Sequence, residues 1–71
     1  MVNVDKLRGR IVEHRTSVSE LARQIGIDPA TLYRKMNNSE SFTIKEADAI
    51  VQALSLSKDD AVAIFFNQFV A

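Results

Sequence analysis

Apolar residues recur at every third or fourth position along most of the chain. Near the N-terminus, Val4, Leu7 and Ile11 follow this spacing, and a longer stripe runs from Ile44 to Leu54. Residues at this spacing share one face of an α-helix, whereas a half-buried strand would alternate apolar and polar residues. The pattern therefore predicts an all-α fold of five short helices, at about residues 4–12, 18–25, 29–36, 44–54 and 58–68.

Residues that favour helix N-termini stand before these segments. Ser17 and Thr43 are each followed three residues later by a glutamate. This is the spacing of a capping box, in which two residues exchange side-chain-to-backbone hydrogen bonds. Asp28 precedes Pro29, and proline suits the first helical position because the N–H that it lacks would have no partner there. The remaining candidate caps are Asn3, Asp5 and Ser57.

The length and composition narrow the class of protein. The chain has 71 residues, no cysteine and a single histidine, His14. Without a thiol, a catalytic carboxylate pair or a glycine-rich loop, it is predicted to have no enzymatic activity, metal site or cofactor, and His14 is expected on the surface. The longest apolar run, residues 61–66, is far shorter than the ~20 residues that span a bilayer, and no leader resembles a signal peptide. We therefore expect one cytoplasmic domain over residues 1–71 with no membrane contact.

The net charge of zero hides an uneven distribution of charges. Residues 1–35 carry seven cations against four anions, a net charge of +3, and residues 36–71 carry two cations against five anions, a net charge of −3. The basic half is compatible with a polyanionic partner. It is equally compatible with charges that only keep a small domain in solution. Charge alone leaves these two interpretations open.

Residues 18–38 form the most informative segment. They contain two short predicted helices that only Gly26, Ile27 and Asp28 separate. Gly26 suits the left-handed backbone that ends a helix, because it has no Cβ. Ala22 stands where two steeply crossing helices would approach each other most closely. Since the second helix starts at once after Asp28, the two axes must diverge sharply, as in a helix-turn-helix unit.

This segment resembles the helix-turn-helix of the phage-repressor-like family of DNA-binding regulators, the Cro-repressor or xenobiotic-response-element type. The resemblance continues through residues 42–47 and 50–57 and covers about residues 4–66 in all. It implies a five-helix, lambda-repressor-like domain that binds duplex DNA sequence-specifically and regulates transcription. The helix at residues 29–36 would then lie in the major groove. Residues 64–71 are further similar to small phage and prophage regulators of Gram-positive bacteria.

The resemblance also implies which residues would contact DNA. Relatives often have an apolar residue at the position of Lys35, so we infer that Met36 packs inward with Leu32 and leaves Lys35 outward. Arg34 would bind guanine through two hydrogen bonds or, alternatively, contact a phosphate or solvent. Helix N-termini and the loop after the recognition helix are expected to meet the phosphate backbone. The candidate DNA-binding residues are Ser17, Ser19, Ala30, Thr31, Tyr33, Arg34, Lys35, Asn37, Asn38, Thr43 and Lys45.

Two roles stay open for the arginines of the first helix and for the domain as a whole. Arg8, Arg10 and Arg15 would contact phosphates if the first helix lies beside the groove; otherwise they are solvated or pair with Glu13. The alternative function is a protein-interaction module that has the helix-turn-helix fold and little affinity for DNA. The zero net charge supports it, and so does Pro29, which stands where relatives often carry a polar base-reading residue.

The last predicted helix has more apolar residues than one helix stripe needs. Phe65 or Phe66 is expected to complete the core. Phe69 and Val70 are the better candidates for a two-fold interface between two copies of the chain, because the family reads paired half-sites about 34–36 Å apart. A homodimer on duplex DNA is therefore the predicted assembly.

Overall fold

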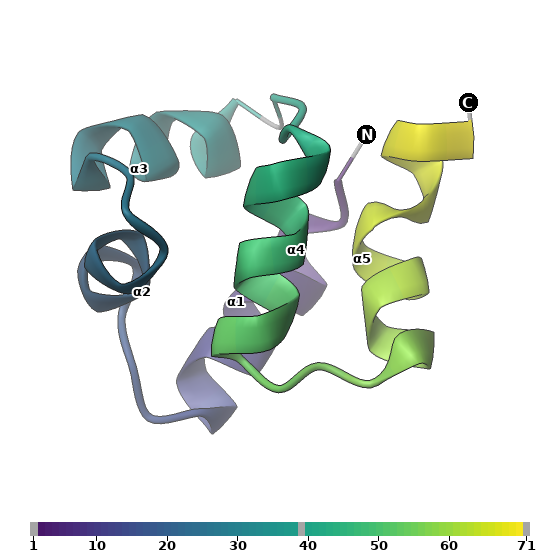
Figure 1. The fold of residues 1–71 in the computed structure, drawn as a ribbon, viewed down its shortest axis with the longest axis horizontal. Helices are drawn as coiled ribbons and strands as arrows, with labels where there is room; N and C mark the ends of the chain where they lie inside the picture. The colour runs from purple at the N-terminus through teal and green to yellow at the C-terminus, as the bar shows by residue number, and fades with distance from the viewer. Residues whose placement is uncertain (1, 39, 71) are drawn as a thin grey trace.

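Within the residues that the structure describes, five helices make up the fold (Figure 1). The computed structural model describes the backbone of residues 2–38 and 40–70 and the side chains of residues 2–38 and 40–65. The helices are α1 (Val4–Glu13), α2 (Val18–Ile25), α3 (Pro29–Asn37), α4 (Ile44–Ala53) and α5 (Lys58–Val70). The predicted all-α class is confirmed, and each predicted helix boundary lies within two residues of the observed one. Among the described residues, no helix is both long and apolar enough to cross a membrane.

Each helix begins at a side-chain cap that the sequence indicated. The five capping residues are Asn3, Ser17, Asp28, Thr43 and Ser57. Four of them accept a hydrogen bond from the backbone N–H three residues later, and Asp28 accepts one from the N–H of Ala30 at 2.8 Å. The complete capping box forms only at α4 within the described chain, because at α2 the carboxylate of Glu20 pairs with Arg23 instead. The caps therefore account for where the helices start.

The core lies where all five helices meet. Helix α2 packs against α3 and α4, and α1 packs against α5. The largest fully buried side chains are Leu7, Leu21, Leu32, Met36, Ile50 and Ile64. The prediction that Leu32 and Met36 face inward is thus confirmed. Burial of such a side chain contributes roughly 1.5–3 kcal/mol, so these two residues fix α3 on the rest of the domain.

A charged cluster connects the two terminal helices. The guanidinium of Arg10 on α1 donates to both carboxylate oxygens of Asp60 on α5 at 3.0 Å, and it also contacts Glu13. The Nζ atom of Lys6 lies 3.7 Å from the same Asp60 carboxylate. The hydrogen bonds between Arg10 and Asp60 raise the pKa of Arg10 and lower the pKa of Asp60. Of the two roles open to Arg10, the structure therefore shows pairing with acidic residues of its own chain.

Candidate nucleic-acid interface

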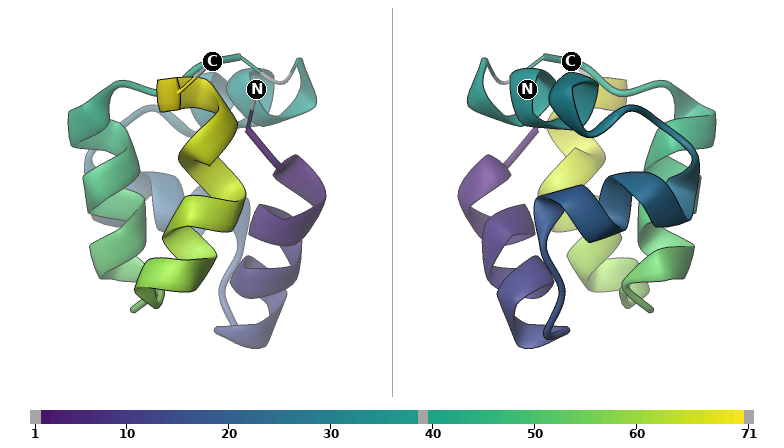
Figure 2. Two further views of the ribbon diagram at one scale, coloured as in Figure 1. Left: turned by 90° about the vertical axis from the view of Figure 1, so that its right-hand side faces the viewer. Right: turned by 90° about the vertical axis from the view of Figure 1, so that its left-hand side faces the viewer.

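The turn between α2 and α3 has the backbone that its glycine predicted. Gly26 ends α2 with a φ of +80°, in the left-handed region, and the N–H of Ile27 donates to the carbonyl of Ala22 at 3.0 Å. The side chain of Ala22 is completely buried, as a close approach of two helices requires. Figure 1 shows α2 almost end-on and α3 from the side, and the right-hand view of Figure 2 reverses this, so the two axes cross steeply.

Helix α3 has one continuous exposed face. The exposed residues Ala30, Tyr33, Arg34 and Asn37 are spaced at i, i+3, i+4 and i+7, which places them on one side of the helix. The exposed fraction is 42% for Tyr33 and 57% for the side chain of Arg34. In Figure 1, α3 lies along the upper edge of the molecule, above α2 and beside the start of α4. This face is therefore open to a large partner.

The prediction that Lys35 points outward is wrong. Its side chain is only 14% exposed, and its Nζ atom donates to Oε1 of Glu46 on α4 at 2.8 Å. The same ammonium group lies 5.6 Å from the centre of the Phe42 ring. Met36 does fill the core as expected. The long stem of Lys35 also packs inward, because the carboxylate of Glu46 lies within reach of its ammonium group. Lys35 therefore connects α3 to α4 instead of joining the exposed face.

Arg34 is exposed, but it already has an acidic neighbour. Its Nε atom lies 3.5 Å from Oε2 of Glu40, in the segment between α3 and α4. The side-chain amide of Asn38 lies 3.4 Å from the same oxygen. The backbone N–H of Glu40 donates to the carbonyl of Lys35 at 2.8 Å, which holds the acidic residue against the end of α3. The most prominent cation of the face is thus partly neutralised within its own chain.

The comparison with known families agrees with this geometry. Residues 6–64 match the family of Cro/C1-type helix-turn-helix (HTH) DNA-binding domains. The chain belongs to this family. No curated protein and no solved structure has a significant match to the chain. The family match includes α2, the turn and α3, so the exposed face described above lies on the second helix of the helix-turn-helix.

Helix α1 of this Cro/C1-type domain reaches the end of α3. Nη2 of Arg8 donates to Oδ1 of Asn37 at 2.8 Å, although the two residues are 29 positions apart. Arg8 also lines a shallow depression with Ser17 at the start of α2. A cation of α1 therefore lies beside two of the predicted contact residues, as the phosphate role of Arg8 requires.

The other predicted contact residues differ in their exposure. Ser17, Asn38, Thr43 and Lys45 are exposed, and Ser19 and Thr31 are half-buried. Ser17 and Thr43 also cap the helices that follow them. Their hydroxyl oxygens already accept a hydrogen bond from the backbone. Any further contact with an anion would therefore use the hydroxyl hydrogens or the free N–H groups of the first helical turns.

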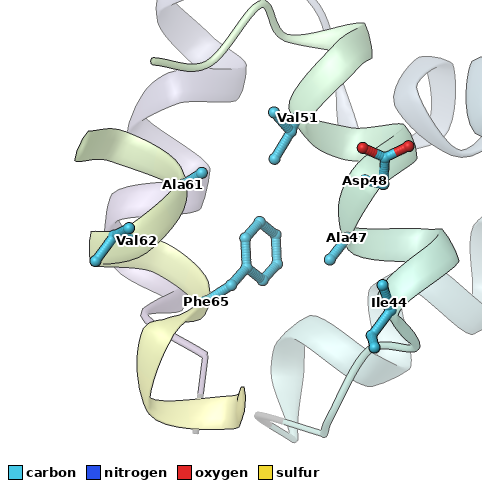
Figure 3. A pocket seen from close by; sticks show the side chains of 7 residues that line it. All are labelled: Ile44, Ala47, Asp48, Val51, Ala61, Val62 and Phe65. Carbon is cyan, nitrogen blue, oxygen red and sulfur yellow. The ribbon is translucent and has the colours of Figure 1, made fainter. Parts of the chain in front are cut away.

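The Cro/C1-type domain also carries an apolar groove between α4 and α5. It has a volume of about 290 Å³ and is shown with its lining side chains in Figure 3. Ile44 at its edge is 75% exposed and Val62 is 45% exposed. Phe65 lies at its floor and is buried, with its ring against Phe42 at 5.9 Å between centres, which confirms its predicted core role. The predicted dimer residues Phe69 and Val70 lie outside the described side chains, as does Phe66.

Reasoning from the sequence missed the acidic partners of α3. Glu40 and Glu46 follow α3 in the chain and were not among the candidates, because cations and amides are the usual contacts to DNA. For Glu46 a signal was present, since its place in the capping box puts its carboxylate at the start of α4. For Glu40 no periodicity or motif gives such a signal. Its pairing with Arg34 follows from the path of the chain after α3.

Proposed function

We propose that this protein is a sequence-specific DNA-binding regulator of transcription that places α3 in the major groove. The observation that carries the proposal is the exposed face of α3, in which Ala30, Tyr33, Arg34 and Asn37 share one side of the helix. Leu32 and Met36 hold the opposite side in the core, so this face has a defined orientation. A helix presented in this way fits the major groove of B-form DNA.

Each residue of the face has a role that its chemistry supports. Arg34 would donate two hydrogen bonds to the O6 and N7 atoms of guanine, which contributes about 1–3 kcal/mol of discrimination. Ala30 would contact the methyl group of thymine, and Tyr33 would pack on a sugar or reach a base edge. The backbone at the starts of α2 and α4, with Lys45, would bind phosphates and fix the register.

Phosphate neutralisation would supply much of the affinity. Of the cations in the basic half, Arg8 and Arg34 lie near the exposed face, whereas Arg10 and Lys35 are engaged with carboxylates inside the domain. If a dimer neutralises about four to six phosphates, the logarithm of the binding constant should fall against the logarithm of the salt concentration with a slope of roughly −4 to −5. The dimer and an origin in a phage or prophage of a Gram-positive bacterium are parts of this proposal that rest on the resemblance.

Selection of bound sequences from a random duplex pool tests the proposal. We expect an enriched palindrome, and we expect Arg34→Ala to reduce the preference for this sequence over random duplex. Lys58→Ala is the matched control, because it removes a cation at the start of α5, at the opposite end of the molecule from α3 (Figure 1). Equal losses on both kinds of DNA would assign Arg34 to a phosphate contact.

The same measurements separate the proposal from a protein-interaction module. A DNA-binding domain of this family should bind random duplex measurably at low salt, because phosphate contacts do not depend on sequence. If no binding to random duplex is detected there, the interaction module becomes the better explanation. The apolar groove between α4 and α5 would then be the first surface to examine.

A further inference from the structure

The proposed base-reading arginine has an acidic partner within its own chain. Glu40 contacts Arg34 at Nε, 3.5 Å away, which is the nitrogen nearest to the stem of the side chain. Among the described residues, no hydrogen bond engages Nη1 or Nη2 of Arg34. A guanine is read by these two terminal nitrogens, or by one of them together with Nε. The contact with Glu40 therefore leaves the outer edge of the guanidinium available.

Glu40 is itself held in place. Its backbone N–H is bonded to the carbonyl of Lys35 at 2.8 Å, and its carboxylate lies near the amide of Asn38. Its side chain is 39% exposed, less than the 57% of Arg34. The acid is thus the better-anchored member of the pair. An arginine has several rotatable bonds, and a neighbour that restricts them before binding reduces the entropy lost on contact with a base.

The charge of Glu40 acts differently on bases and on phosphates. A carboxylate beside Arg34 cancels much of its net charge, so a phosphate near the pair gains less attraction. The edge of guanine offers neutral acceptors, and a hydrogen bond to these depends more on orientation than on net charge. Glu40 should therefore weaken contacts with random DNA more than contacts with the preferred sequence.

From these observations we infer that Glu40 is a specificity-determining residue, which positions Arg34 for a base and disfavours its use on phosphates. The inference rests on the proposed function, because it concerns the same α3 face. It assigns to an acidic residue outside the recognition helix a part in the choice of DNA sequence. It also accounts for an anion kept beside a DNA-binding surface, where a positive charge would give tighter binding.

The variant Glu40→Gln tests this inference, because it removes the charge and keeps the size of the side chain. Affinity is measured for two duplexes: the sequence enriched by the wild type from a random pool, and an unselected random duplex. We expect the affinity for random duplex to rise about two- to fivefold and the ratio of the two affinities to fall about three- to tenfold. Glu13→Gln is the matched control, since it also removes a carboxylate that contacts an arginine, at the end of α1 far from α3.

A thermodynamic cycle with Arg34→Ala shows whether Glu40 acts through the arginine. In the Arg34→Ala background, Glu40→Gln should leave the ratio of affinities unchanged. In the free wild-type protein, the NMR signal of the Arg34 Nε–H group should be that of a restrained side chain, and Glu40→Gln should shift it towards that of a freely rotating arginine. Thermal unfolding of each variant checks that the fold is retained.

Three outcomes would overturn the inference. If Glu40→Gln raised the affinity for both duplexes equally, Glu40 would only repel the phosphates of DNA. If the variant lowered the affinity for both duplexes and also lowered the Tm, Glu40 would only support the fold. A fall in the ratio that persists in the Arg34→Ala background would show that Glu40 does not act through the arginine. Failure of the proposed function is distinguishable, because the wild type would then enrich no sequence before any variant is compared.

Discussion

Lys35 offers the sharpest test of how α3 is held on the rest of the domain. Its ammonium group donates to Glu46 at 2.8 Å, and the two side chains are only 14% and 18% exposed. Lys35→Met keeps most of the apolar stem and removes the charge. Glu46 then keeps its bond from the backbone N–H of Thr43 but loses its only ion-pair partner in the described chain.

The expected loss of stability lies between two known limits. Exposed ion pairs contribute about 0.2–1 kcal/mol, whereas breaking a fully buried pair costs about 3–5 kcal/mol. For two groups that are each mostly buried, we expect Lys35→Met to lower the free energy of unfolding by about 2 kcal/mol. In a domain of this size that corresponds to a fall in Tm of roughly 8–16 °C.

The pH dependence of the stability difference provides a second, independent test of this prediction. Burial by itself would raise the pKa of Glu46, but the hydrogen bonds from Lys35 and from the N–H of Thr43 outweigh it and lower the pKa below its ordinary value of 4.5. A carboxyl group whose pKa is lowered on folding stabilises the protein above its unfolded pKa, and this stabilisation is lost as the pH falls through the folded pKa. The difference between wild type and Lys35→Met should therefore be largest near neutral pH and shrink below about pH 4.5.

Urea unfolding followed by circular dichroism measures this difference at several pH values. Lys45→Met is the matched control, because Lys45 is an exposed lysine on α4 and its loss should change the stability by less than about 0.5 kcal/mol. If the two variants lose the same stability, or if the effect of Lys35→Met does not change with pH, the pairing with Glu46 does not hold α3 in place.

Two further predictions concern the turn and the terminal helices. Gly26→Ala should lower the free energy of unfolding, measured in urea, by about 1–2 kcal/mol. The loss would come from backbone strain at a φ of +80° alone, because an added Cβ would meet no atom within 4 Å. An unchanged free energy of unfolding would contradict this strain. Asp60→Asn should lower the Tm near neutral pH. Because the hydrogen bonds from Arg10 lower the pKa of Asp60, the difference in Tm from wild type should begin to shrink as the pH falls below 3.8, and it should vanish only once the pH is below the lowered pKa of the folded protein. A difference that does not shrink with falling pH would assign the loss to packing.

The sequence alone was sufficient to predict the helices and much of the core. Caps such as Ser17 and Asp28 act on N–H groups two or three residues away, and apolar periodicity reports the face of a single helix. Gly26 and Ala22 likewise act locally, one through its backbone and the other through its size. These signals need no knowledge of the rest of the chain, so a short window of residues predicts them.

Only the tertiary structure decided which charged residues face outward. Lys35 pairs with Glu46 across 11 positions, Arg8 bonds to Asn37 across 29, and Arg10 reaches Asp60 across 50. Long charged side chains can extend in several directions, and their choice depends on which opposite charge the packing of the helices brings within reach. For that reason the sequence by itself determined the α3 helix and its buried side, whereas the fold determined which cations remain available on the other side.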